Sequence, residues 1–112
     1  MREDGKLDYL EMPGGEVPAT KQFYGAAFGW TFTDYGPEYA AFEQGLDGGF
    51  DASAPSGQAP LPVLYASDLE AMAAKVEAAG GTIIRAIFAF PGGRRFHFRD
   101  PAGNELAVWS EG

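Results

Sequence analysis

The sequence contains no cysteine among its 112 residues and only one histidine. The absence of cysteine excludes disulfide bonds, a zinc site built from thiolates and a cysteine nucleophile. Basic residues are also scarce, with 8 Lys and Arg against 16 Asp and Glu and a net charge of −8. Nucleic-acid binding needs a basic surface, so we expect no nucleic-acid partner and attribute the acidity to solubility.

Long apolar runs are absent as well. No stretch approaches the roughly 20 apolar residues that a membrane-spanning helix requires. The segment Met1–Lys6 is charged and is not followed by the apolar core of a secretory signal. We therefore expect a cytoplasmic protein without membrane contact, folded as a single domain over residues 1–112.

The chain repeats itself with a constant offset of 52 residues (68 − 16 = 52), which relates Glu16–Trp30 to Asp68–Thr82. Each copy begins with an acidic residue, which suits the positive end of a helix. Apolar residues then follow at helical spacing, and each copy ends at glycine and enters a β-type run. Such an internal repeat predicts two structurally equivalent modules.

Strand-like segments flank both predicted helices. They are residues 6–12, 30–33, 39–43 and 48–51 in the first half, and 61–66, 82–84, 95–99 and 105–110 in the second. This pattern predicts an α+β fold of paired βαβββ modules, with eight strands and two main helices. Because a helix covers one face of each sheet, we expect the opposite faces to enclose an inter-sheet cleft.

The module boundaries follow from composition. Module 1 is expected at about 6–52 and module 2 at about 61–111. The intervening linker, about 53–60, is rich in Ala, Ser, Pro and Gly. The segment Phe88–Arg95 is either a lip of the cleft that supplies arginine to an anionic ligand or an ordinary hairpin, and we favour the hairpin.

Three motifs carry a resemblance to a known family. They are Phe23–Trp30 (FYGAAFGW), Asp100–Asn104 (DPAGN) and Glu11–Pro13 (EMP). In this order they resemble the vicinal oxygen chelate family, which includes glyoxalases, bleomycin-resistance proteins and extradiol dioxygenases. The resemblance implies paired βαβββ modules and a cleft that often holds divalent Zn, Fe, Ni or Mn. Each module of the metal-dependent members supplies one ligand from its first strand and one from its last.

The ligand positions that the resemblance implies fall on Tyr9, Phe50, Leu61 and Ala107. These side chains cannot form a divalent metal site, because only tyrosine offers a donor atom. The neighbouring Asp8 and Asp51 have the opposite strand parity, so we expect them to be solvated. We predict no family-type metal and no other cofactor.

Three titratable residues are candidates for acid–base catalysis. His97 alternates with Phe96 and Phe98, so it faces the cleft if the phenylalanines face the helix, and otherwise lies in the core or at the surface. Glu11 and Glu105 share the parity of the ligand positions. Each is a general acid or base, a partner for a cationic ligand, or a solvated residue at a strand end.

Aromatic side chains are also predicted to face the cleft. They are Tyr9, Phe50, Tyr65 and Trp109, and together with Glu11 and His97 they form the predicted ligand-binding set. Aromatic rings at such positions suit stacking on a flat or cationic ligand. The alternative is that they fill the cavity as core.

Three functions remain open at this point. The first is a metal-free protein that binds a small aromatic or hydrophobic ligand. The second is an enzyme of the family, lyase, isomerase or dioxygenase-like, that uses a metal with non-standard ligands or Glu/His acid–base chemistry. The third is a structural or regulatory module. Because relatives commonly pair, we also expect a homodimer. The sequence does not name the ligand.

Overall fold

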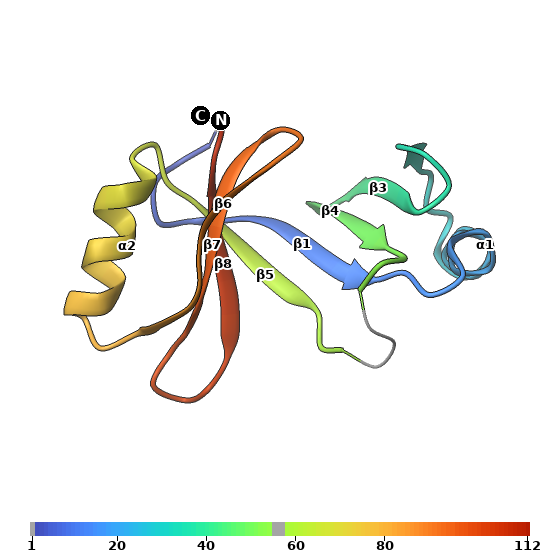
Figure 1. The fold of residues 1–112 in the computed structure, drawn as a ribbon. Helices are drawn as coiled ribbons and strands as arrows, with labels where there is room; N and C mark the ends of the chain where they lie inside the picture. The colour runs from blue at the N-terminus through green and yellow to red at the C-terminus, as the bar shows by residue number, and fades with distance from the viewer. Residues whose placement is uncertain (1, 55–57) are drawn as a thin grey trace. The chain divides into compact units, whose positions relative to one another are not determined.

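The computed structural model describes residues 2–54 and 58–112 (Figure 1). Contacts divide the chain into two compact units. The α1 unit is Tyr9–Leu61, and the α2 unit is Pro62–Gly112 together with the residues up to Asp8. The predicted linker 53–60 includes residues 55–57, which lie outside the described residues.

The described residues form eight strands and two helices, which confirms the predicted α+β fold with two βαβββ modules. The elements are β1 (Leu7–Pro13), α1 (Val17–Phe28), β2 (Thr33–Asp34), β3 (Tyr39–Gln44), β4 (Leu46–Asp51), β5 (Leu61–Tyr65), α2 (Leu69–Ala78), β6 (Thr82–Phe90), β7 (Gly93–Arg99) and β8 (Glu105–Ser110). Neither helix is long and apolar enough to cross a membrane.

The two modules share one pattern of strand pairing. In the α1 unit the order is β2-β3-β4-β1, and in the α2 unit the corresponding order is β6-β7-β8-β5. The first and last strands of each module pair in parallel, with Glu11 opposite Gly49 and Val63 opposite Ala107. The first strands therefore keep the 52-residue offset that the sequence predicts, which makes the repeat a structural one.

Two strands differ in length from the prediction. The strand expected at 30–33 is reduced to the two residues of β2, because Trp30 turns into the core and stacks on Tyr24 with ring centroids 4.8 Å apart. In contrast, β6 runs on to Phe90 and turns directly into β7 at Gly92, whose φ is 136°. The predicted hairpin in 88–95 is therefore confirmed.

The residues before Asp8 belong with the second module and not with the first. The Gly5 N–H donates to the Tyr65 carbonyl (2.8 Å), and the Tyr65 N–H donates to the Lys6 carbonyl (3.2 Å). The chain thus enters along the end of β5, and β1 is divided between the two units.

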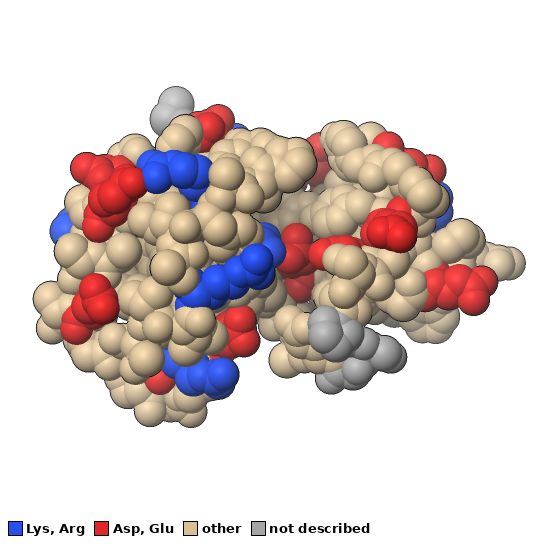
Figure 2. Space-filling view, viewed as in Figure 1, with Lys and Arg blue, Asp and Glu red and all other residues tan. Residues whose placement is uncertain are grey.

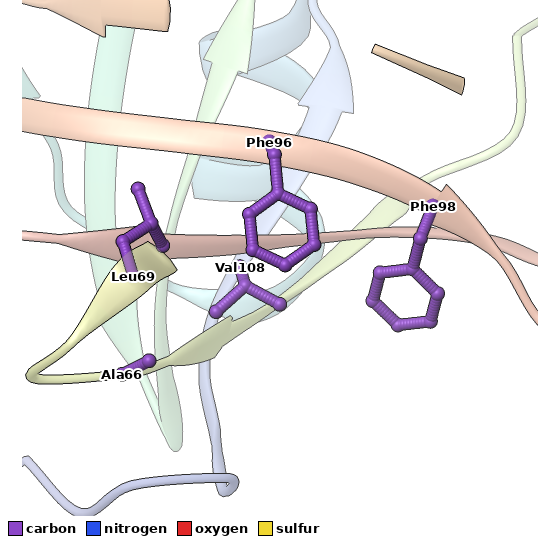
Figure 3. Close-up of a cluster of buried hydrophobic side chains, with 5 residues drawn as sticks. All are labelled: Ala66, Leu69, Phe96, Phe98 and Val108. Carbon is purple, nitrogen blue, oxygen red and sulfur yellow. The ribbon is translucent and has the colours of Figure 1, made fainter. Parts of the chain in front are cut away.

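The core of the α2 unit lies between its strands and α2 (Figure 3). Phe96 and Val108 point from β7 and β8 toward Leu69 at the start of α2, and all three are at most 1% exposed. Phe98 lies on the same face of β7 as Phe96. Because side chains alternate along a strand, residue 97 lies on the opposite face.

The core of the α1 unit is a group of stacked and tilted rings. Phe50 is 2% exposed and lies with its ring centroid 5.1 Å from Tyr24 of α1 and 5.4 Å from Phe42 of β3. Trp30 lies 4.9 Å from Phe42. These contacts place the even-numbered residues of β3 and β4 on the helix side of their sheet.

The two helices begin differently, and this difference generates a prediction about stability. The Asp68 side chain accepts a hydrogen bond from the Ala71 N–H (3.0 Å), whereas Glu16 at the start of α1 makes no side-chain cap. Because the Asp68 cap satisfies a free N–H of α2, Asp68→Ala should lower the free energy of unfolding by about 1 kcal/mol.

The matched variant Glu16→Ala should change the free energy of unfolding by less than about 0.5 kcal/mol. Urea unfolding followed by circular dichroism measures both variants. Equal losses for the two would show that the Asp68 cap contributes nothing specific to α2.

Candidate functional site

The face of the α2 unit that lies opposite α2 gathers polar and aromatic side chains. His97 lies at its centre on β7, with Arg85 of β6 and Ala107 of β8 as its cross-strand partners. Phe96 and Phe98 pack toward α2, so of the two orientations that the sequence left open His97 has the one that faces away from the helix.

His97 and Glu105 form a hydrogen-bonded pair on this face. The His97 Nδ1 lies 2.9 Å from the Glu105 Oε2, and His97 is 7% exposed. The His97 Nε2 is buried and has no hydrogen-bond partner among the described residues. The sequence named both residues as acid–base candidates, and the structure brings them into contact.

The protonation state of His97 follows from its surroundings. Burial lowers the pKa of the imidazole, the hydrogen bond from His97 Nδ1–H to the Glu105 carboxylate partly offsets this, and the charge of Arg95 lowers the pKa further. The ring is therefore neutral at neutral pH, with Nδ1–H donating to the Glu105 carboxylate. The buried Nε2 then carries a lone pair and acts as a hydrogen-bond acceptor.

Arg85 is a residue of this face that the sequence did not reveal. Its guanidinium lies 3.7 Å from the centroid of the Phe88 ring, and that ring lies 5.8 Å from the imidazole of His97. No hydrogen bond or ion pair joins Arg85 to another described residue. The predicted strand ended at residue 84 and so did not include Arg85. The observed β6 continues past Arg85 and pairs it with His97.

A group of aromatic rings lies on the same sheet face. Tyr65 contacts Trp109 edge to face at 5.5 Å, and Phe90 lies 6.3 Å from Trp109. The three rings are half-buried. The structure thus brings together Tyr65 and Trp109, two members of the predicted ligand-binding set.

Two residues near the N-terminus fix the orientation of Trp109. The indole Nε1–H donates to the Asp8 Oδ2 (2.9 Å), and the Arg2 guanidinium lies 5.0 Å from the ring centroid. Arg2 also pairs with Asp8 at 3.2 Å. The expectation that Asp8 is solvated is wrong, because its side chain is 19% exposed and bridges Arg2 to the indole.

The corresponding face of the α1 unit carries a small tyrosine–glutamate cluster. The hydroxyls of Tyr9 and Tyr39 are hydrogen-bonded to each other, and the Tyr39 hydroxyl donates to the Glu11 Oε2 at 3.4 Å. Burial raises the pKa of both tyrosines, so both stay protonated and act as hydrogen-bond donors. Tyr9 and Glu11 are therefore neighbours on one face, as their spacing predicts.

The face predicted for Phe50 is wrong. In β4 the residue opposite Glu11 is Gly49, and Phe50 points into the ring cluster beneath α1. A side chain at Gly49 would collide with the Tyr39 ring, so the present position of that ring requires glycine there. Asp51 consequently shares the face of Gly49, where its carboxylate accepts hydrogen bonds from the N–H and hydroxyl of Ser53.

The corrected ligand positions do not fit a divalent metal. They are Tyr9, Gly49, Leu61 and Ala107. The one donor atom among these side chains is the Tyr9 hydroxyl, which is protonated and bonded to Tyr39. Among the described residues, no group of three or more His, Asp or Glu side chains is arranged to hold a metal ion.

The chain matches a known protein family. The family model of the Glyoxalase/Bleomycin resistance protein/Dioxygenase superfamily matches residues 6–108. A comparison of the sequence with curated proteins finds no match.

Several solved structures share the fold at low sequence identity. A Vibrio splendidus 12B01 member of the same superfamily has a TM-score of 0.72 and 16% identity, and the match covers 94% of this chain and 99% of that one. A protein described as NAD-dependent benzaldehyde dehydrogenase from Legionella pneumophila has a TM-score of 0.76 and 14% identity, covering 93% and 98%. Methylmalonyl-CoA epimerase from Mycobacterium tuberculosis has a TM-score of 0.67 and 12% identity, covering 100% and 91%.

The family model covers the first βαβββ module, the second module as far as Val108 and all three motifs that carried the resemblance. The chain therefore belongs to the Glyoxalase/Bleomycin resistance protein/Dioxygenase superfamily.

Proposed function

We propose that this member of the superfamily binds a small aromatic or hydrophobic molecule without a metal ion. The binding surface is the face of β5–β8 that lies opposite α2. The observation that carries the proposal is the half-buried aromatic group of Tyr65, Phe90 and Trp109 on that face. The side chain of Ala107, at the metal-ligand position of β8, has no donor atom.

The aromatic group has the properties of a ligand surface. Stacking or edge contact with a ring contributes about 0.5–1.5 kcal/mol beyond the area it buries. Trp109 is held by Asp8 and Arg2, so little side-chain entropy remains to be lost when a ligand binds. A flat apolar molecule can therefore contact the oriented indole of Trp109 and the rings of Tyr65 and Phe90.

A second candidate function is acid–base catalysis by His97, which the His97–Glu105 pair favours. A general base must be unprotonated at the working pH and must be held in one orientation. Burial keeps the imidazole neutral, and Glu105 fixes the tautomer that carries the lone pair on Nε2. Glu105 then acts as a positioning residue for His97.

Fluorescence can locate the ligand, because the chain has two tryptophans, Trp30 and Trp109. In Trp30→Phe the remaining indole is that of Trp109. Titration with neutral aromatic compounds should change its emission saturably, because the ligand contacts the ring. In the matched variant Trp109→Phe, Trp30 remains within the core of the α1 unit and its emission should stay constant.

A saturable signal from Trp30 together with a silent Trp109 would place the ligand elsewhere and refute the proposed surface. The proposed surface would also be refuted if no aromatic compound of the series changed the emission of Trp109.

Removal of metals tests the proposal that binding needs no metal ion. Ligand affinity should be unchanged after chelation and dialysis, and addition of Zn²⁺, Ni²⁺, Mn²⁺ or Fe²⁺ should leave it unchanged, because the ligand positions offer no donor set. Isothermal titration calorimetry with and without each ion measures this. Metal bound in stoichiometric amount and required for binding would contradict the metal-free proposal.

Acid–base catalysis by His97 requires a low pKa of its imidazole, which can be measured. NMR titration of the ring Cε1–H should give a midpoint below the ordinary value of 6.5. Glu105→Gln should lower the midpoint further, because the carboxylate of β8 favours the charged ring while Arg85 of β6 and Arg95 of β7 oppose it. An imidazole that titrates above 6.5 would rule out a neutral base at neutral pH.

The same shift sets the sign of the stability change. Because the folded-state pKa lies below the unfolded-state value, the unfolded chain binds more protons between the two. The contribution of His97 to the free energy of unfolding is therefore full above pH 6.5 and is lost as the pH falls through the folded-state pKa.

A further inference from the structure

Arg85 and His97 are directly opposite each other on β6 and β7. The register of β6 shifts on both sides of Arg85, but its guanidinium stacks on Phe88, whose ring lies 5.8 Å from the His97 imidazole, so Arg85 and His97 serve the same sheet face. Two such side chains can therefore contact adjacent groups of one small molecule. Their chemistry is complementary, since one is a cation with several donors and the other is a neutral acceptor.

Arg85 is available to an anion. Its side chain is exposed, and stacking on Phe88 at 3.7 Å orients the guanidinium without engaging it in an ion pair. The planar guanidinium matches a carboxylate with two parallel hydrogen bonds. An arginine that is already held by an aromatic ring loses less conformational freedom when it binds.

The distribution of charge favours an anion at the α2 unit over one at the α1 unit. The α2 unit carries 7 basic and 9 acidic residues, a net charge of −2, whereas the α1 unit carries 1 and 7, a net charge of −6. Most Lys and Arg side chains visible in Figure 2 accordingly lie on the α2 unit. The strongly acidic total of the protein thus does not apply to the surface around Arg85.

His97 supplies a hydrogen-bond acceptor beside Arg85. Its Nε2 is a buried acceptor that lacks a partner among the described residues, and leaving such a group unpaired is unfavourable. A ligand group that donates a hydrogen bond to Nε2 recovers that loss. Because Nε2 is buried, a ligand reaches it only when a side chain that covers it turns aside.

We propose that Arg85 and His97 together bind a small organic acid that carries a hydroxyl or N–H donor next to its carboxylate. Arg85 holds the carboxylate, and the His97 Nε2 accepts the hydrogen bond from the neighbouring donor. Phe88 and the aromatic group supply the apolar contacts, so the ligand class is an aryl-substituted hydroxy or amino acid derivative. The inference rests on the proposed function and names the ligand for the same sheet face.

Three matched probes separate the two contacts. They are 3-phenyllactate, 3-phenylpropionate, which lacks the hydroxyl, and 3-phenyllactamide, which lacks the charge. In calorimetric titrations of the wild-type protein, the amide should bind about tenfold more weakly than 3-phenyllactate. The acid without the hydroxyl should bind about fivefold more weakly.

Variants assign each preference to its residue. Arg85→Gln should abolish the preference for the acid over the amide. Arg94→Gln is the matched control, because Arg94 pairs with Glu70 and its loss removes the same charge from the neighbouring strand. The control should keep that preference. His97→Gln should abolish the preference for the hydroxyl.

A measurement on the wild-type protein covers the case in which a variant fails to fold. In long-range ¹H–¹⁵N NMR spectra, 3-phenyllactate should shift the His97 Nε2 resonance more than 3-phenylpropionate does. Amide and acid of equal affinity, or an Nε2 resonance that ignores the hydroxyl, would overturn this inference and leave the aromatic surface intact. Failure of all three probes at millimolar concentration would overturn the proposed function with it.

Discussion

The alternation of side chains along β7 is the constraint on which the candidate site depends. Phe96 and Phe98 must point toward α2, because together with Leu69 and Val108 they form the core of their unit. Their burial commits His97 to the other face of the sheet, whatever function it has there. A one-residue slip of β7 would expose two phenylalanines and bury a polar ring against α2, so hydrophobic packing of the core also fixes the register of the site.

The pairing of β7 with its neighbours then sets the chemistry of that face. Glu105 and Arg85 reach His97 from opposite sides, through β8 and β6. A buried imidazole between a carboxylate and a cation remains neutral, because burial outweighs the favourable charge of Glu105. The sheet thus presents one unsatisfied acceptor and one unpaired cation side by side, and this combination selects a ligand that is both anionic and a hydrogen-bond donor.

Sequence reasoning recovered the parts of this protein that repeat and missed a part that does not. The 52-residue offset and the glycines after both helices were enough to predict two βαβββ modules. The sheet face on which Phe50 lies was predicted wrongly. The reason is that β4 begins at Leu46, directly after Gly45, whereas a longer turn precedes Glu105 in the second module. Arg85 was missed for a related reason, since the apolar pattern that marks a strand weakens after Ile84 while β6 continues to Phe90.

The two modules show how one fold came to carry different surfaces. The strand register makes Tyr39 the counterpart of Arg95 and Ala41 the counterpart of His97. In the first module the Tyr39 ring lies over Gly49, so that face is closed by a neutral hydrogen-bonded pair with Tyr9. In the second module the residue opposite His97 is Ala107, and the positions equivalent to Tyr39 and Ala41 are polar. Because the second module combines a small residue at the ligand position with the unsatisfied acceptor of His97, a ligand gains a hydrogen bond by binding to its sheet face.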